Sequence, residues 1–273
     1  MSKFEILCAT MYQKDFSKIQ QMNIHSDVIF TNQADRTAME EMKFEGHCAR
    51  MITTDTRGLG INRNLALLYA QGEICLLADD DVTYYDDMER QVLSEFDAHP
   101  DADIIIFHLN TDSNRKLKKY SRTQKCNRLY WKSWGSVRIA FKLQAVRKAN
   151  IWFSTVFGSG GVFSSGEDSL WIADVRKRGL TIYVSKETIG SVSFEKSTWF
   201  SGYDECYFYN KGAFYQAAHP RTILIWMAYF ILRTRKLGTL PASKKLKWMR
   251  YGREGYREMK SYDTYCGNQL EKV

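Results

Sequence analysis

Three consecutive acids, Asp79, Asp80 and Asp81, follow an apolar run at residues 74–78. The run carries no charge and has the length of a buried central strand. Adjacent carboxylates repel one another unless a positive charge lies among them, and ligands of open α/β sheets bind just beyond the carboxyl ends of the strands. The acids therefore predict a divalent cation that carries a phosphorylated substrate. A polar turn in which one aspartate caps the following helix would explain them without a metal.

A second acidic pair, Glu167 and Asp168, follows a glycine-rich stretch at residues 157–166. Acids in the first turn of a helix complement its dipole and cap free N–H groups, and this explanation satisfies the local sequence. A carboxylate held in a cleft could instead act as a general base toward a sugar hydroxyl. A glycine loop beside it would let a bulky acceptor approach.

Positive charge is unevenly distributed along the chain. The formal net charge is +8, yet no acid lies between Asp112 and Glu167, where Lys and Arg occur 12 times. Such blocks indicate anionic partners, namely phosphates, nucleic acid or an anionic membrane, although a solvated surface is sufficient for any single basic residue. The Trp and Tyr side chains interleaved at residues 115–152 would stack on sugar rings or on single-stranded nucleic acid.

Size and composition indicate a soluble fold with a substantial core. The 273 residues, 44% of them hydrophobic, are enough for one large domain with an appendage. The 6 cysteines form no CxxC pair, which predicts reduced, mostly buried thiols and neither a disulfide framework nor a zinc site. The first residues run directly into a strand pattern and show no signal-peptide pattern, so we expect a cytoplasmic protein.

Hydrophobic periodicity predicts alternating strands and helices, an order typical of an α/β fold with a mainly parallel sheet and helices on both faces. In the helix after Gly58 we expect Ile61, Leu65 and Leu68 to form the apolar stripe, and residues 32–35 have the composition of a loop. Strands are expected at residues 4–10, 27–31, 49–53, 74–78, 103–109, 137–143, 180–185 and 189–194, and helices at 14–24, 61–72, 88–99 and 169–178.

The C-terminal part is interpreted as a basic helical extension, residues 217–273, that follows a domain at residues 1–216. Residues 222–232 carry no charge and lie between Arg221 and Arg233. They are too few to cross a bilayer, which needs about 20 apolar residues. They predict either a buried helix or a helix in a membrane interface with its basic neighbours on anionic lipid.

The order of these motifs resembles the family 2 glycosyltransferases of the GT-A fold, over roughly residues 4 to 200. Each motif is short, and their order and spacing are more specific than any one of them. The stretches that carry the resemblance are Asn32-Gln33-Ala34-Asp35, Gly58-Leu59-Gly60-Ile61-Asn62-Arg63-Asn64, Leu77-Ala78-Asp79-Asp80-Asp81 and Glu167-Asp168.

The resemblance implies inverting transfer from a nucleoside-diphosphate sugar, a UDP-sugar above all, with Mn²⁺ or Mg²⁺. It implies that Asp79 and Asp81 are the metal ligands and that Asp168 is the catalytic base. Arg63 would contact the nucleotide or brace its loop. The nucleotide-sugar contacts implied are Thr10, Tyr12, Asn32, Asp35, Arg63, Asp79 and Asp80, and the candidates for acceptor or diphosphate contacts are Trp134, Glu167, Lys196 and Trp199.

The sequence departs from the family pattern at three places. Ala78 stands where the family's acidic motif has its first Asp, which leaves open which of the three acids meets the metal. Asn32-Gln33 stands where acids are usual, so recognition of the base differs. Residues 193–197 contain no histidine, and Lys196 could face the diphosphate instead.

Two other classes of protein remain open at this point. A nucleotidyltransferase can use a similar sheet and acidic metal site, although no glycine-rich, lysine-bearing phosphate loop is present. A basic nucleic-acid-binding module would explain the charge but not the acids at residues 79–81, so a nucleic-acid partner is not expected. The leading hypothesis is a transferase of bacterial surface polysaccharide synthesis. Under this hypothesis we expect it to act in the cytoplasm on a saccharide or lipid-linked acceptor, and a peripheral position at the inner face of the cell membrane is the alternative to a fully cytoplasmic one.

Overall fold

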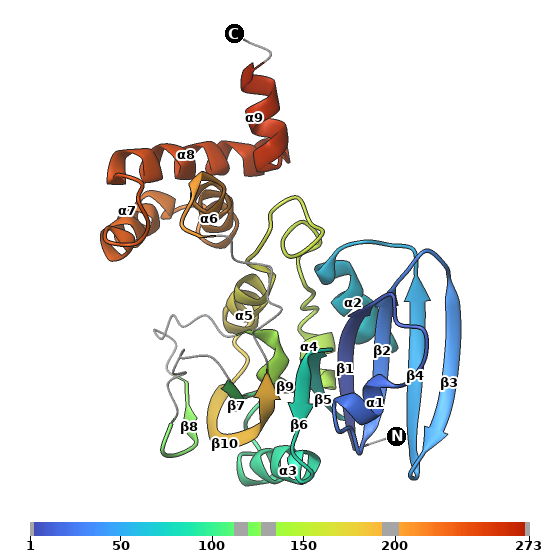
Figure 1. Cartoon of the computed structure of the whole chain (residues 1–273). Coiled ribbons are helices and arrows are strands. Elements are labelled where there is room, and N and C mark those ends of the chain that lie inside the picture. Colours follow the sequence, from blue (N-terminus) through green and yellow to red (C-terminus); the bar gives the residue numbers. More distant parts are fainter. Residues whose placement is uncertain (1–2, 112–119, 127–134, 193–201, 271–273) are drawn as a thin grey trace.

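The structure is a computed structural model that describes residues 3–111, 120–126, 135–192 and 202–270. Within these residues, ten strands form one sheet in the order β3-β4-β2-β1-β5-β9-β7-β10-β6, and β8 also pairs with β10. Helices cover the sheet, and a C-terminal helical region lies beyond it (Figure 1). All six cysteines carry free thiols, and two of them, Cys8 and Cys75, are buried.

Four neighbouring strands form the parallel part of the sheet. Helices cover both of its faces, which explains why these strands are near-continuous apolar runs in the sequence. The register places Ala9 of β1 beside Asp79 of β5, so the carboxyl ends of the two strands lie at the same edge of the sheet. The four strands are β1 (Phe4–Met11), β2 (Asp27–Gln33), β4 (His47–Thr54) and β5 (Ile74–Asp79).

The other strands make the sheet mixed. β3 (Ala38–Phe44) is antiparallel to β4, and β9 (Ile139–Lys142) runs antiparallel between β5 and β7 (Ile104–Thr111). β10 (Ile182–Val192) is parallel to β7, while β6 (Val82–Tyr84) and β8 (Gln124–Lys125) are antiparallel to β10. A 3₁₀ turn, Ser136–Arg138, leads into β9.

Each face of the sheet packs on its own helices, because successive side chains of a strand point to opposite faces. Leu76 belongs to the core under α3 (Met88–Ala98) and the short α1 (Lys18–Gln21). Leu77 belongs to the core on the other face. That core is covered by α2 (Leu59–Tyr69), α4 (Leu143–Lys148) and α5 (Glu167–Lys177).

A buried ion pair fixes where β5 begins. Glu5 of β1 is paired with Arg50 of β4, and both residues are buried. The other oxygen of the Glu5 carboxylate accepts the backbone N–H groups of Gln71 at 2.6 Å and of Gly72 at 3.0 Å. The carboxylate thus holds the chain in register just before the strand that ends in the three acids.

Several expected elements differ in extent. The helix expected at residues 14–24 is reduced to the four residues of α1, because Asp15 accepts a hydrogen bond from the Ser17 N–H in a local turn that competes with the helix. The strands expected at 180–185 and 189–194 form one strand, β10, whose register against β7 shifts twice. Residues 32–33 continue β2 instead of forming a loop.

One strand was not predicted, and one expected helix face was wrong. Strand β3 was not expected, although the turn to β4 has Glu45 and Gly46 with φ of 47° and 85°, as a two-residue hairpin turn requires. In α2 the expected apolar stripe is not the buried face. Leu68 is exposed, whereas the polar Asn62 and Arg63 are buried.

The C-terminal helices are α6 (Glu205–Ala218), α7 (Ile223–Thr234), α8 (Ala242–Glu258) and α9 (Tyr262–Leu270). Helices α6 and α8 cross in backbone contact at two glycines. A Cβ at Gly212 would lie 2.0 Å from the carbonyl oxygen of Met249, and one at Gly252 would lie 1.8 Å from that of Tyr209. The boundary expected after residue 216 falls in the last turn of α6.

Helix α7 contains the uncharged stretch 222–232 almost entirely. Among the described residues, no helix combines the length and apolar character needed to cross a membrane.

Candidate active site

The three consecutive acids lie at the carboxyl ends of β1 and β5. Asp79 is the last residue of β5, and Asp80 and Asp81 form the turn that leads into β6. This is the carboxyl edge of the parallel strands, the expected place for a ligand.

Arg63 of α2 joins the two acidic motifs. Its side chain is 4% exposed, and its guanidinium donates to the carboxylates of Asp79 at 3.0 Å and Asp168 at 2.5 Å. A Glu167 oxygen lies 3.5 Å away. Burial favours the neutral guanidine, yet the charges of Asp168, Asp79 and Glu167 raise the pKa of Arg63 above its ordinary value. Three carboxylates therefore converge on one buried cation.

Close backbone packing places Arg63 at this point. Gly58 caps α2 with φ of 118°, a conformation that glycine adopts without strain. Gly60 abuts the next segment so closely that a Cβ would lie 2.0 Å from the carbonyl oxygen of Ser154. The Arg63 guanidinium lies 5.4 Å from the centre of the Phe153 ring, a cation–π distance.

Glu167 and Asp168 form the first turn of α5, and they differ in access. Glu167 is buried, its carboxylate accepts the Gly166 N–H at 3.0 Å, and a Cβ at Gly158 would lie 2.9 Å from its carboxyl carbon. Burial and the charge of Asp168 raise the pKa of Glu167, and Arg63 opposes this. The Asp168 side chain is 21% exposed. Of the pair, Asp168 has the more exposed carboxylate, 21% against 12% for Glu167.

Lys18 of α1 is a second cation beside the acids. Its Nζ donates to the backbone carbonyl of Asp80 at 2.9 Å and lies 3.3 Å from the Asp80 carboxylate. Partial burial, followed by the charges of Asp79 and Asp80, raises the pKa of Asp81 to about 6. Uncompensated negative charge therefore remains at this edge of the sheet.

The acids at residues 79–81 fit a divalent cation that arrives with a diphosphate. Within the described part of the chain, no three acids, histidines or cysteines are arranged to enclose a metal on their own. Mg²⁺ sites in nucleotide enzymes usually take one or two carboxylates, with phosphate and water as the other ligands. Asp79 and Asp81 can supply two carboxylates. A cation would neutralise charge at Asp81, whose pKa is raised first by partial burial and then by the charges of Asp79 and Asp80.

Tyr12, Asp35 and Arg57 gather beyond the ends of β1 and β2. Arg57 is paired with Asp35, donates to the Tyr12 hydroxyl at 3.3 Å, and lies 5.6 Å from the centre of the Tyr12 ring. The Tyr12 ring is exposed, and its φ of 51° is unusual outside glycine. An exposed ring with charged hydrogen-bonding groups beside it suits a planar nucleobase. Tyr12 and Asp35 were expected here, and Arg57 was not.

Thr10 and Asn32, also expected to contact the nucleotide, lie below this cluster in the interior. The Asn32 amide oxygen accepts the Gln13 N–H at 2.9 Å, and its nitrogen donates to the Gln13 carbonyl at 2.9 Å and to the Thr53 hydroxyl at 3.2 Å. Thr10 donates to Asn32 at 3.4 Å. Both residues fix the backbone that presents Tyr12, and their direct contact with a nucleotide stays a prediction.

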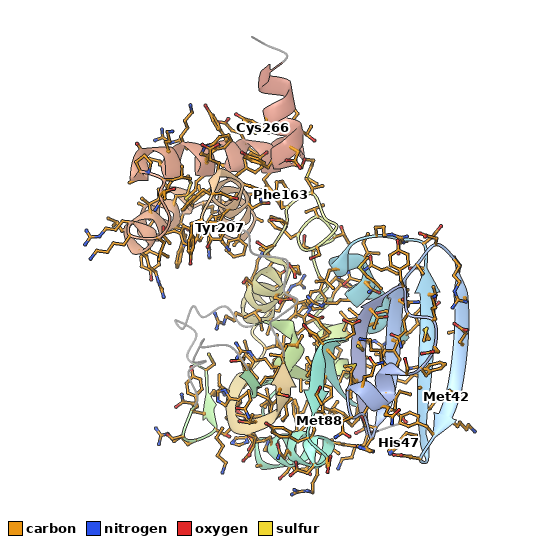
Figure 2. The ribbon with its side chains drawn as sticks, in the orientation of Figure 1. Met42, His47, Met88, Phe163, Tyr207 and Cys266 are labelled. Atoms are coloured by element: carbon orange, nitrogen blue, oxygen red, sulfur yellow. The ribbon has the colours of Figure 1, made fainter. Side chains whose placement is uncertain are left out.

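The C-terminal helices reach the site through the glycine-rich loop, residues 157–166. The Ser164 N–H donates to the Asn210 side chain at 2.9 Å, and a Cβ at Gly166 would lie 2.9 Å from the Phe214 ring. Phe163 packs against Tyr256 of α8 with 5.7 Å between ring centres, and Figure 2 shows Phe163 on the loop below the C-terminal helices. Helix α6 therefore packs against the loop that precedes Glu167 and holds it in position.

Sequence reasoning did not identify Lys18, Arg57 or Lys211 as residues of the site. Lys211 of α6 lies 5.4 and 5.5 Å from the ring centres of Tyr207 and Phe214. Burial lowers the pKa of Lys211, and the charge of Glu167 opposes this. These basic residues carry no local motif, and only the fold brings them to the acids. Trp134, Lys196 and Trp199, expected at the acceptor or diphosphate, lie outside the described residues.

Comparison with known proteins identifies the family. The sequence profile of "Glycosyl transferase family 2" matches residues 26–167, just over half of the 273 residues. A search of curated proteins gave no match. The fold is similar to that of S. aureus TarS 1–349 in complex with UDP-GlcNAc, with a TM-score of 0.61 and 14% identity over 95% of this chain and 93% of that one.

A second similar structure is the mannosyltransferase PcManGT from Pyrobaculum calidifontis in complex with GDP-Man and Mn²⁺. Its TM-score is 0.51, with 12% identity over 95% of this chain and 88% of that one. At these identities the two structures show a shared fold, and they confirm the expected GT-A architecture with its C-terminal helices.

The family match decides among the three classes that the sequence left open. It includes Arg63 and the acids at residues 79–81 and ends at Glu167, so it covers most of the site described above. A nucleotidyltransferase or a nucleic-acid-binding module would not produce this match. The chain therefore belongs to glycosyl transferase family 2 and is a glycosyltransferase.

Proposed function

We propose that the protein transfers a sugar, with inversion, from a UDP-sugar to a hydroxyl of a saccharide or lipid-linked acceptor during synthesis of a bacterial surface polysaccharide. The strongest support is that Asp79 and Asp168 both contact Arg63. This shared contact places the proposed diphosphate-binding edge of the sheet next to a partly exposed carboxylate. TarS was determined with UDP-GlcNAc and PcManGT with GDP-Man and Mn²⁺, which supports a nucleotide-sugar donor and a divalent cation.

In this proposal the donor binds along the ends of β1 and β5. Tyr12, Asp35 and Arg57 hold the base, and Asp79 and Asp81 hold Mn²⁺ or Mg²⁺ at the diphosphate. An ion held there by Asp79 and Asp81 would supply Lewis-acid stabilisation of the charge on the departing diphosphate. Lys18 keeps the turn at residues 80–81 in place through its contacts with Asp80.

Asp168 acts on the acceptor side. It accepts the proton of the acceptor hydroxyl while that oxygen forms a bond to the anomeric carbon, and the bond from this carbon to the diphosphate breaks on the opposite face. Inversion needs no glycosyl-enzyme, so one accessible carboxylate is sufficient. Arg63 orients Asp168, and the buried Glu167 anchors the start of α5.

The acceptor and location are proposed from the basic C-terminal helices. Ten Lys or Arg residues occur between positions 233 and 260, with two acids, and this charge suits an acceptor carried on an anionic lipid. We place the activity in the cytoplasm, at the inner face of the cell membrane.

The donor half of the proposal is tested by thermal denaturation with a panel of nucleotide sugars and Mn²⁺. A UDP-sugar at about 100 times its dissociation constant should stabilise the protein by about 2.7 kcal/mol. Asp81→Ala should abolish this shift, because it removes a carboxylate from the cation. Asp174→Ala, an exposed acid farther along α5, is the control and should retain the shift. If no nucleotide sugar raises the melting temperature with metal present, the proposed donor class is wrong.

The acceptor half is tested by Asp168→Asn. This variant should keep the donor-dependent melting shift but transfer sugar about 10²- to 10⁴-fold more slowly, the usual contribution of a general base. Asp174→Asn, on the same helix, should transfer at the unmodified rate. Unchanged turnover in Asp168→Asn would remove this residue from the mechanism without affecting the donor assignment.

A further inference from the structure

Helix α7 presents a continuous apolar face to solvent. Leu224, Ile225, Tyr229 and Leu232 are 61%, 69%, 48% and 68% exposed. At 100° per residue these side chains, with the exposed Ala228 between them, lie within an arc of about 140°. An apolar stripe of this length on a solvent-facing helix is typical of an interaction surface.

The opposite face of α7 is already packed, so the helix has a fixed orientation. Ile223 and Met227 are buried with Phe208 and Met249 of the helical region. Lys245 of α8 is fully buried and donates from its Nζ to the carbonyls of residue 234 at 2.8 Å and residue 237 at 2.7 Å. These bonds satisfy carbonyls at the end of α7 and hold it against α8.

Positive charge borders the exposed apolar face. No acid occurs between Glu205 and Glu254, whereas ten Lys or Arg residues do. Several of them are exposed at the two ends of α7. They are Arg221 before the helix, and Arg233, Arg235 and Lys236 at and after its last turn. In Figure 1, α7 lies at the outer edge of the helical region, away from the sheet.

We infer that α7 docks on an anionic lipid bilayer. The helix lies in the plane of the interface, with the Leu224–Leu232 face at the boundary of headgroups and acyl chains and the basic residues at the level of the lipid phosphates. A short amphipathic helix with a charged border binds in this way, through buried apolar area together with attraction to anionic lipid. This docking rests on and deepens the location given under the proposed function, and it can fail in the vesicle test without affecting the donor and transfer assignments.

Charge argues for lipid over a second copy of the chain on this face. A symmetric pair joined through α7 would bring the same surface of each copy together. Arg221, Arg233, Arg235 and Lys236 of one copy would then face the same cations of the other, without an acid on this part of the chain to compensate them. Anionic phosphates supply the missing charge.

The test is flotation of the full-length protein with vesicles of phosphatidylcholine alone or mixed with phosphatidylglycerol. We expect binding to the anionic vesicles, weakened by salt as screening increases, and little binding to phosphatidylcholine. Leu224→Glu with Ile225→Glu should reduce binding by at least about tenfold, since it removes apolar area and adds charge. Leu68→Glu on α2, where the native leucine is also 61% exposed, is the matched control and should bind normally.

The charge contribution has its own pair of variants. Arg235→Ser with Lys236→Ser should weaken binding to anionic vesicles, whereas Lys177→Ser with Arg178→Ser, adjacent exposed cations at the end of α5, should not. Melting temperature and size-exclusion chromatography of each variant establish that it is folded and report its oligomeric state. Equal binding to both vesicle types, no binding at all, or a wild-type dimer that Leu224→Glu converts to a monomer would each overturn the lipid assignment.

Discussion

At the scale of residues, Arg63 is the group on which both halves of the site depend. A buried cation is tolerated only when its lost hydration is compensated, and here Asp79, Glu167 and Asp168 do so together. The two terminal nitrogens of its guanidinium are engaged by these contacts, which fits the bracing role, and a direct contact of Arg63 with the nucleotide stays a prediction. The residue therefore sets the distance between the diphosphate edge and the proposed base.

Replacing Arg63 by Met should destabilise the protein by about 3 kcal/mol, because it leaves carboxylates near one another without their shared cation. Arg63→Lys should lie between this variant and the wild type, since it keeps the charge but loses the forked geometry. Arg90→Met, which breaks an exposed pair with Asp87, should cost less than about 1 kcal/mol. Urea denaturation of the three variants measures these differences, and equal losses for Arg63→Met and Arg90→Met would refute the central role of Arg63.

The sequence predicted the acidic residues of the candidate site better than its basic residues. Asp79, Asp81 and Glu167-Asp168 stand in recognisable patterns at the ends of predicted elements, and the structure brings the two motifs together. Arg57 and Lys211 are single basic residues in a chain that has 39, and nothing local separates them from the solvated ones. Their importance comes from contacts between distant segments, which periodicity and local composition do not encode.

At the scale of elements, the buried parallel strands were predictable because a short, uncharged apolar run is typical of a strand that is covered on both faces. β3 was not predicted because most of its side chains are exposed and it lies at the edge of the sheet. The face of α2 was misjudged for a functional reason. Its inward side carries Asn62 and Arg63, polar residues that hydrophobic periodicity assigns to solvent, and Arg63 joins the two acidic motifs.

The crossing of α6 and α8 leads to a prediction about Gly252. Gly252→Ala should destabilise the protein by on the order of 3 kcal/mol, because the new methyl group would overlap the backbone of Tyr209 and force the helices apart. Gly267→Ala in α9 is the control, since its Cβ meets no atom within 4 Å and alanine favours the helix by up to about 1 kcal/mol. In thermal denaturation, the melting temperature of Gly252→Ala should fall below that of the wild type, and that of Gly267→Ala should rise above it. A neutral Gly252→Ala would mean that the helices do not cross in backbone contact.

At the scale of the whole molecule, the sheet domain and the C-terminal helices both contact the glycine-rich loop, residues 157–166. The strands position the acids at residues 79–81 and α2 positions Arg63, while α6 holds the loop that leads to Glu167 and Asp168. The sequence indicated a helical extension, because an uncharged stretch and a basic stretch follow the last strand pattern. It did not indicate that α6 contacts both the sheet domain and the other C-terminal helices. That contact depends on packing of α6 against a glycine-rich loop more than 40 residues earlier in the chain.

Because α6 serves both parts, the chain cannot be shortened cleanly after residue 216. Such a truncation would keep most of α6 but remove α8, whose backbone covers Gly212 and Tyr209. Phe208 and Tyr209, both fully buried in the intact protein, would become apolar surface beside the loop of residues 157–166. A shortened protein would tend to aggregate through this surface, and we expect its inactivity to reflect displacement of the loop of residues 157–166 rather than loss of an acceptor site.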